Sequence, residues 1–401
     1  MDAALAAYDG LQRTDGPDAG LLARVAEALL AREARSQDRV TRRGAVAELA
    51  MAGAAGRPLL ERLAWAPGPP HVEALEALAR RGDTHAERWL RGLVDDDDPE
   101  VRAAAVLGLD VRLDRALLLA AMTDPHPRAR ALAAERLGRA APDSVARRAL
   151  EDAARLDPDV GVRATAVRAL GSFGREAVGA LLDQLGAPEP SLRLAAVTAL
   201  CQADRDAARG LVGTLLARPA SSAAVEAARW LAATAPQATG HRDVDAEATL
   251  RQALASHDPA LRAQAGVALA SWPDAASFGP AVQEALSAET DDGVRLALAR
   301  ALLQTEAGRA HALEALRALA RASQTMDGLQ AAALLAAAGD AEAPGWIAPF
   351  LGRAEPSLRQ AAARAIARDA GRPDEVRALL RDADVQVRLA AAGALLSSAG
   401  R

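Results

Sequence analysis

The sequence predicts an all-α fold: an α-solenoid, a right-handed superhelix of about twelve helical hairpins. Of the 401 residues, 51% are hydrophobic but only 2% are aromatic, so the apolar content is mainly Ala, Leu and Val. Such small side chains suit helices that approach one another closely. A short unit also recurs about every 28 to 36 residues. A chain of this length avoids splitting into separate cores only if its fold grows in one dimension.

Each copy of the unit is a turn followed by a helix that carries one arginine. The two clearest copies read DPEVRAAAVLGL from Asp98 and DPALRAQAGVAL from Asp258. Further copies start at Glu189, Glu355, Asp159, Asp291 and Asp384, and looser ones surround Arg130 and Arg42. Weaker units, with Glu73, Glu226 and Gln330 near the arginine position, fill the long gaps.

Each part of the unit has a physical reason. The acidic residue four positions before the arginine is an N-cap acceptor for free helix N–H groups. A proline after it, such as Pro99 or Pro259, occupies the first helical position, where its missing N–H costs nothing. The apolar residues one before, three after and seven after the arginine share one helical face. A second amphipathic stretch lies between these helices, for example at 174–185 or 280–288, so each repeat is helix A, a short turn and helix B.

This pattern of acidic residue, proline, Val-Arg and Ala-x-x-x-Leu resembles HEAT repeats, in the short bacterial form known as PBS-lyase HEAT-like. The resemblance covers nearly the whole chain from about residue 20. Because the shared residues build the repeat, the resemblance implies a fold much more than a function.

Two stretches depart from the repeat. Residues 1–17 are predicted to be a partly ordered N-terminal segment or cap, and 18–401 the solenoid, with an irregularity at the polar stretch 234–247. The C-terminus ends inside a helix B, from Val387 to Leu396, without a polar capping helix. Because an uncapped end exposes apolar surface, self-association through this end is one expectation.

The charge, the cysteine content and the hydropathy of the sequence limit the partners, cross-links and location to be expected. No lysine occurs, so all 48 basic residues are arginines, and the net charge is −5. An acidic balance argues against nucleic acid or an anionic membrane. Cys201 is alone, which excludes an internal disulfide, and no apolar run reaches membrane-spanning length. With no basic leader at the N-terminus, a cytoplasmic location is expected.

The arginine column is the most conspicuous candidate site. Its arginines could line a groove for phosphate or carboxylate groups, or pair with turn acids of their own or the next repeat. The recurring acid favours the second interpretation, a structural ladder. Its predicted members are Asp98, Arg102, Arg130, Asp159, Arg163, Glu189, Arg193, Asp258, Arg262, Asp291, Arg295, Glu355, Arg359, Asp384 and Arg388.

Other residues carry weaker signals. The acidic run at 95–98 lacks the spacing of a calcium loop. None of the six histidines is followed by Glu, and none has another four residues away, so the paired His-Glu motif of the HEAT-like deoxyhypusine hydroxylases is absent. The five tryptophans are interpreted as packing between layers, since the basic groove of the HEAT-like DNA glycosylases has no counterpart. No catalytic, cofactor-binding or metal-binding residues are predicted.

A partner is expected on the concave B-helix face, at positions one, two and five after the arginine. The candidates are Leu107, Leu132, Glu135, Arg168, Leu194, Thr198, Leu296, Arg300, Gln360, Arg364 and Leu389. Either these leucines line a groove for a protein or peptide partner, or adjacent B helices cover them. The favoured function is a non-catalytic scaffold or adaptor. The alternative, from the resemblance alone, is an enzyme or enzyme subunit of the bilin-lyase type.

Overall fold

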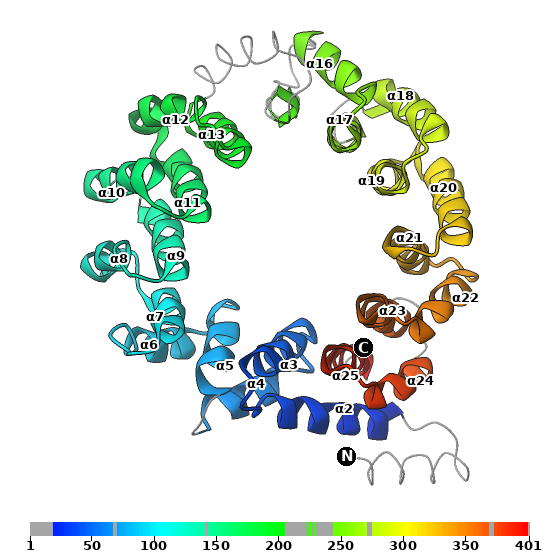
Figure 1. Ribbon diagram of the computed structural model, residues 1–401, viewed down its shortest axis with the longest axis horizontal. Coiled ribbons are helices and arrows are strands. Elements are labelled where there is room, and N and C mark those ends of the chain that lie inside the picture. Colours follow the sequence, from blue (N-terminus) through cyan, green and yellow to red (C-terminus); the bar gives the residue numbers. More distant parts are fainter. Residues whose placement is uncertain are drawn as a thin grey trace. The chain divides into compact units, whose positions relative to one another are not determined.

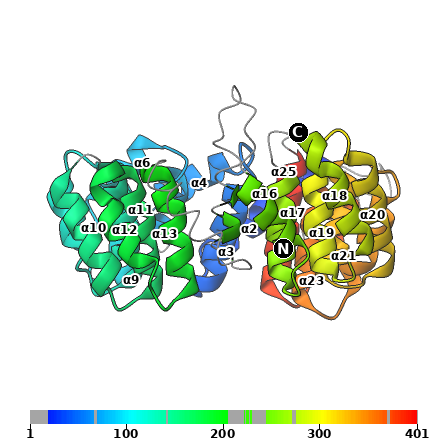
Figure 2. The ribbon, with the colours of Figure 1, turned by 90° about the horizontal axis from the view of Figure 1, so that it is seen from above.

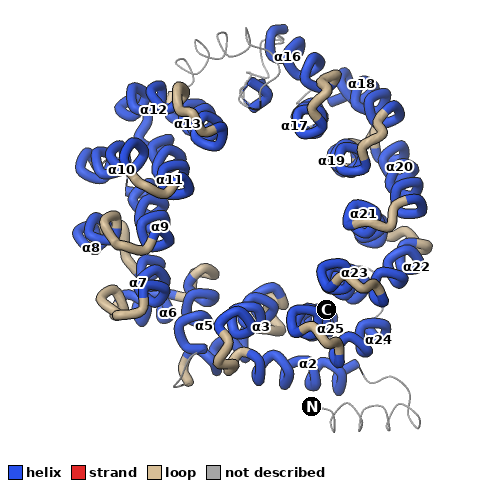
Figure 3. Tube along the Cα trace, viewed as in Figure 1, coloured by secondary structure: helices blue, strands red, loops and turns tan. Residues whose placement is uncertain are grey.

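A computed structural model describes residues 19–66, 70–140, 143–204, 222, 224–226, 228–229, 244–270, 275–368 and 373–399. Across these ranges every regular element is a helix, as the tube in Figure 3 shows. None of the helices in them is both long and apolar enough to cross a membrane. The predicted segment 1–17 and most of the predicted irregularity at 234–247 lie outside the described residues.

The chain divides into two compact units, 90–315 and the two ends 1–89 with 316–401. The unit formed by residues 90–315 includes helices α7 (Pro99–Ala105), α8 (Arg115–Ala121), α9 (Pro127–Leu137), α10 (Ser144–Leu156), α11 (Val160–Leu170), α12 (Val178–Gln184), α13 (Pro190–Ala203), α16 (Val244–Leu254), α17 (Pro259–Ala270), α18 (Ala275–Ala288) and α19 (Asp292–Leu302). Helices α6 (Thr84–Arg91) and α20 (Arg309–Ala322) run across the divisions. We call residues 90–315 the central unit.

The other unit, which we call the terminal unit, contains both chain ends. Its helices are α2 (Ala19–Glu33), α3 (Arg39–Met51), α4 (Arg57–Ala64), α5 (Pro70–Ala79), α21 (Met326–Ala337), α22 (Ala343–Ile347), α23 (Pro356–Arg368), α24 (Pro373–Val376) and α25 (Val385–Ala399). Within each unit the helices form successive A–B pairs, α10 with α11 and α12 with α13 being examples in Figure 1. Figure 2 shows α10 to α13 side by side from a second direction.

The predicted turn chemistry accounts for the starts of the B helices. The Asp159 carboxylate accepts a hydrogen bond from the Val162 N–H at 2.9 Å, and that of Asp291 accepts one from Val294 at 2.9 Å. Pro99 and Pro190 begin α7 and α13. These contacts satisfy amide groups that have no partner inside the helix.

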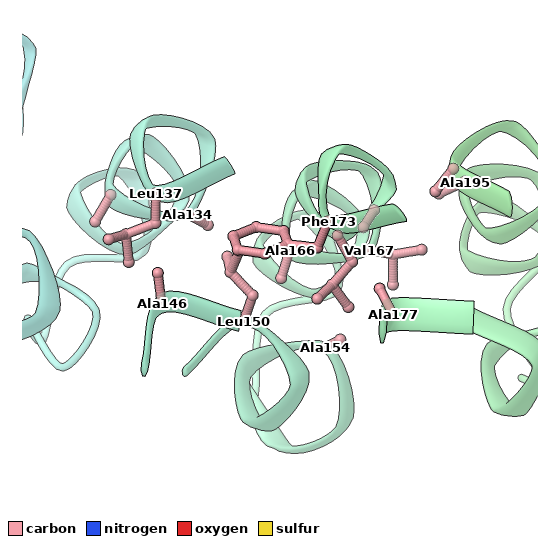
Figure 4. Packing of buried hydrophobic residues seen from close by; sticks show 14 of the residues in the cluster. Ala134, Leu137, Ala146, Leu150, Ala154, Ala166, Val167, Phe173, Ala177 and Ala195 are labelled. Atoms are coloured by element: carbon pink, nitrogen blue, oxygen red, sulfur yellow. The ribbon is translucent and has the colours of Figure 1, made fainter. Parts of the chain in front are cut away.

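Small residues let the helices of the central unit pack closely. Leu150 of α10 lies with Leu137 of α9 and Val167 of α11 in one buried cluster, which Figure 4 shows. A Cβ on Gly138, at the end of α9, would lie only 2.9 Å from the Ala169 Cβ. The core is therefore continuous from repeat to repeat and thin between layers, as the aromatic-poor composition predicts.

In the terminal unit, the first and last repeats of the chain pack together. Helix α25 contacts α23 on its own side and α2 and α3 from the N-terminal end. Leu389, Leu395 and Leu396 are at most 6% exposed, so α25 is buried on both sides. The apolar end expected to be open for self-association is thus covered by the same chain. A helix that is apolar all round requires such cover.

Candidate partner-binding face

Arg130, near the start of α9, joins its own repeat to the next. Its Nη1 donates hydrogen bonds to the carbonyl oxygens of Asp124 and Pro125, at 2.9 and 3.1 Å, in the turn before α9. Its Nε and Nη2 donate to the two carboxylate oxygens of Asp157, at 2.8 and 2.9 Å, in the turn before α11. One guanidinium therefore closes its own turn and holds the next one. The planar fork of arginine fits this bidentate geometry, whereas lysine does not.

The same arrangement recurs, and we call it the arginine ladder. The pairs that join successive repeats, with their closest N–O distances, are Arg42–Glu73 (2.9 Å), Arg102–Asp124 (2.9 Å), Arg130–Asp157 (2.8 Å), Arg163–Glu189 (2.6 Å), Arg262–Glu289 (2.7 Å) and Arg359–Asp382 (2.7 Å). These arginine side chains are 11 to 21% exposed. They are occupied between repeats and do not line an open anion groove.

The acids four residues before the arginine cap their own helices as predicted, at Asp98, Asp159, Asp258, Asp291 and Asp384. Their additional assignment as the acids that join successive repeats is wrong for most repeats. Glu355 accepts the hydroxyl of Ser357, and Glu189 is the member at this position that pairs with a preceding arginine. The usual ladder acid lies six residues before the arginine, as Asp157 lies before Arg163. The acid at this position also recurs in the sequence and could have been found there.

The ladder holds its carboxylates in the ionised form. The hydrogen bond from Arg102 lowers the pKa of Asp124, and that from Arg262 lowers the pKa of Glu289. Burial acts to raise the pKa of Asp157, but its bonds with Arg130 and the Asp159 N–H outweigh burial, so the pKa is lowered. A charged hydrogen-bond donor favours the carboxylate over the acid.

Three predicted ladder arginines have different partners. Arg193 donates to the carbonyl oxygens of Ala187 and Pro188, both at 2.8 Å. Arg388 donates to those of Asp382 and Ala383, at 2.8 and 3.1 Å. Arg295 lies 3.4 Å from a carboxylate oxygen of Asp292, in its own helix. Within the described ranges, all three have their partners in their own repeat.

The leucines predicted on the partner-binding face differ in their exposure to solvent. Leu132 and Leu296 are 8% exposed and Leu389 is 1% exposed, so predicting them as a binding surface is wrong. Leu107 is half-buried against the core cluster. Leu194, at the same repeat position as Leu296, is 36% exposed. Neighbouring helices cover most of these leucines, which leaves little apolar groove.

Polar side chains make up the exposed part of this surface, which we call the B-helix face. Arg168, Thr198 and Arg300 are exposed, whereas Gln360 is half-buried. Arg168 donates to the Thr165 hydroxyl at 2.9 Å. Arg364 is paired with Glu48 of α3.

A shallow hollow lies on the B-helix face of the central unit. It has a volume of about 380 Å³, and its polar lining consists of Glu135, Arg139, Thr165, Arg168, Ser172 and Gln202. Glu135 and Arg168 were predicted, and the others were not. Thr165 lies two positions after Arg163. Arg139, Ser172 and Gln202 each lie nine positions after a ladder arginine, about one helical turn beyond the predicted fifth position. A search one turn further along each B helix would have found these three residues.

Cys201 and the aromatic side chains near the start of the chain were also singled out in the sequence. Cys201 is 5% exposed, and burial raises the pKa of its thiol to about 12, so it is a poor nucleophile at neutral pH. No group of three metal-ligating side chains occurs in the part of the chain that the structure describes. Trp65 and Trp89 lie 6.0 Å apart between ring centroids, and His85 stacks on Trp65 at 4.4 Å.

The hairpins, their small-residue core and the repeated turn chemistry define an α-solenoid. Residues 115–201 match the family model of HEAT repeats. No curated protein sequence matches the chain.

Two solved structures illustrate what the chain is similar to. One is from the complex of CpcE and CpcF of phycocyanin lyase from Nostoc sp. PCC7120. It is 22% identical, with 69% of this chain and 92% of that chain covered and a TM-score of 0.33. The other is from the Kap95:Nup1 complex. It is 14% identical, with 95% of this chain and 64% of that chain covered and a TM-score of 0.41.

Proposed function

We propose that this protein is a non-catalytic scaffold that binds an extended protein segment along the B-helix face of α9, α11 and α13. One observation carries the proposal: three consecutive repeats contribute hydrogen-bonding side chains to a single hollow. Repeats that present side chains in register can follow the backbone of an extended partner.

The charges of the hollow favour a segment that carries carboxylates. Arg139 pairs with Glu135 at 3.0 Å, so these two charges offset one another. Arg168 has the Thr165 hydroxyl as its partner and contacts no carboxylate among the described residues. An exposed guanidinium in this setting can take a carboxylate from a partner in a bidentate geometry. We place this interaction in the cytoplasm, a location that fractionation of a tagged chain would test.

Photo-crosslinking tests the proposed face directly. A photoreactive amino acid would replace Thr198 on the B-helix face or, as a matched control, Leu156 at the end of helix A α10, which is 77% exposed. The full chain would be crosslinked in its native cells and its adducts identified by mass spectrometry. We expect one protein adduct at Thr198 that is missing at Leu156, and adducts only at Leu156 would contradict the proposal.

A charge reversal then tests the role of Arg168. Arg168→Glu is expected to remove the copurifying partner, whereas Arg155→Glu, on the exposed side of α10, is expected to retain it. Retention of the partner by both variants would mean that the hollow is not the binding site. A bound chromophore detected by visible absorbance, in the absence of a stoichiometric protein, would instead favour the bilin-lyase type of function.

A further inference from the structure

A buried carboxylate joins the two ends of the chain within the terminal unit. Glu48 of α3 forms an ion pair with Arg364 of α23, a residue 316 positions later. The Glu48 side chain is 5% exposed and that of Arg364 is 39% exposed. Helix α25 contacts both α3 and α23, so the ion pair reaches across the last helix of the chain.

Gly393 of α25 provides the space for this contact. A Cβ built on Gly393 would lie 2.8 Å from the Glu48 Cβ and would also overlap a carboxylate oxygen of Glu48. Gly393 is five residues after Arg388, the position that Thr198, Val267 and Arg300 occupy in other repeats. Any of those side chains would fill the space through which Glu48 reaches Arg364. We call Glu48, Gly393 and Arg364 the end lock.

At this junction, the residues that the structure describes contain no carboxylate partner for the ladder arginine. Arg388 of α25 donates only to the carbonyl oxygens of its own turn among the described residues. In the turn before α3, the position of a ladder acid, six residues before Arg42, holds Ser36. Like a ladder acid, Ser36 accepts the N–H of the residue two positions on, Asp38, at 3.2 Å. The end lock is therefore a substitute connection between these two repeats.

Helices α25 and α3 also approach closely at Gly44 of α3. A Cβ there would lie 2.8 Å from the side-chain oxygen of Gln386 and 3.0 Å from the Cδ1 of Leu389. If α25 separated from α3, each chain would expose two complementary apolar surfaces. Such surfaces on different copies make a head-to-tail contact, which builds rings or open filaments.

We propose that the end lock selects closure between the two ends of one chain over head-to-tail association of copies. The occupant of the α25 surface is the N-terminal repeat of the same chain. A covalently connected partner is favoured over a second copy by its high effective concentration. The buried Glu48–Arg364 pair adds selectivity, because an apolar contact that leaves this carboxylate unpaired is disfavoured. This inference is independent of the proposed partner-binding function.

Gly393→Ala tests the lock. Alanine ordinarily favours a helix over glycine, so the substitution would stabilise α25 if Glu48 did not occupy the space beside Gly393. We expect instead that amide hydrogen exchange in both α3 and α25 becomes at least about tenfold faster. Light scattering after gel filtration is expected to change from a concentration-independent monomer to concentration-dependent oligomers. The matched control is Gly345→Ala in α22, where a Cβ would meet nothing within 4 Å.

A double variant separates the clash of the new methyl group from the loss of the ion pair. Glu48→Ala combined with Gly393→Ala removes the side chain that the new methyl group would strike, but it also removes the carboxylate that pairs with Arg364. We expect it to recover the folded helix content lost in Gly393→Ala and still to form concentration-dependent oligomers, because the lock is missing. The proposal is overturned if Gly393→Ala remains monomeric with unchanged exchange, if the double variant is a concentration-independent monomer, or if the unaltered chain is itself a head-to-tail oligomer.

Discussion

Arg130 offers the most direct test of the arginine ladder, because its pair is the most buried. The Arg130 side chain is 11% exposed and that of Asp157 is 5% exposed. Arg130→Ala would remove four hydrogen bonds, two to the carboxylate and two to the turn carbonyls. Asp157 would keep the N–H of Asp159, at 2.9 Å, as its remaining partner.

The expected loss of stability is large for a single side chain. Removing one partner of a buried ion pair costs about 3–5 kcal/mol, since the other charge is left without compensation. Arg155, whose pair with Asp152 joins side chains that are 54 and 67% exposed, is the control. Arg155→Ala is expected to change the free energy of unfolding by less than about 0.5 kcal/mol. Arg130→Lys should fall between the two, since lysine keeps the charge but not the fork.

Urea unfolding followed by circular dichroism would measure these differences, and amide exchange would locate them in α9 and α11. Because Asp157 has a lowered pKa, the ladder contributes stability above the unfolded-state pKa of Asp and loses it as the pH falls through the lower folded-state value. The deficit of Arg130→Ala should therefore shrink between pH 7 and pH 3. A loss below about 1 kcal/mol at pH 7, or equal losses for Arg130→Ala and Arg155→Ala, would refute the structural role of the ladder.

Three further predictions concern other buried sites. Burial raises the pKa of the Cys201 thiol to about 12 from an ordinary 9.0. At pH 8 the folded chain should therefore react with a thiol reagent roughly a thousandfold more slowly than the urea-unfolded chain. Equal rates would contradict the burial of Cys201. Gly138→Ala should destabilise the chain by about 1–3 kcal/mol in urea, because the new Cβ would press on Ala169, whereas Gly179→Ala, with nothing within 4 Å, should be neutral or stabilising. Burial raises the pKa of Glu48 even though Arg364 acts to lower it. The charged carboxylate therefore destabilises the folded state at a pH above this pKa, and the destabilisation disappears once acid protonates Glu48. Glu48→Gln should therefore match or exceed the unaltered urea midpoint at pH 7, with the difference vanishing towards pH 4, and a large loss at pH 7 would contradict this.

The local parts of the fold could be predicted because each depends on a few neighbouring residues. The cap of Asp159 and the helical start at Pro99 follow from turn chemistry within four residues. The ladder was predicted only in outline. The pattern suggested that Arg163 pairs with a turn acid, but it did not separate a capping acid such as Asp159 from a bridging acid such as Asp157. That distinction depends on how far one repeat lies from the next.

Exposure on the B-helix face could not be predicted from repeat position. Leu194 and Leu296 both follow their arginines directly, yet one is 36% exposed and the other 8%. Cover at this position comes from the adjacent repeat, whose side chains differ along the chain. Leu389 is an extreme case, because the helix that contacts it includes Gly44, more than three hundred residues earlier. No local pattern carries that information.

The last helix nevertheless contained a signal of its environment. In Val385–Ala399 small and apolar residues occur on every side, which is typical of a helix covered by neighbours on both faces. Such a helix needs neighbours on both sides, and α25 has α23 on one side and α2 and α3 on the other. Gly393 indicates which neighbour covers the second side of α25. It is smaller than its counterparts Thr198, Val267 and Arg300, and a smaller residue improves packing only if another side chain fills the space beside it. Since Glu48 fills it and reaches Arg364, the glycine is best understood as part of the contact that joins the chain's own ends.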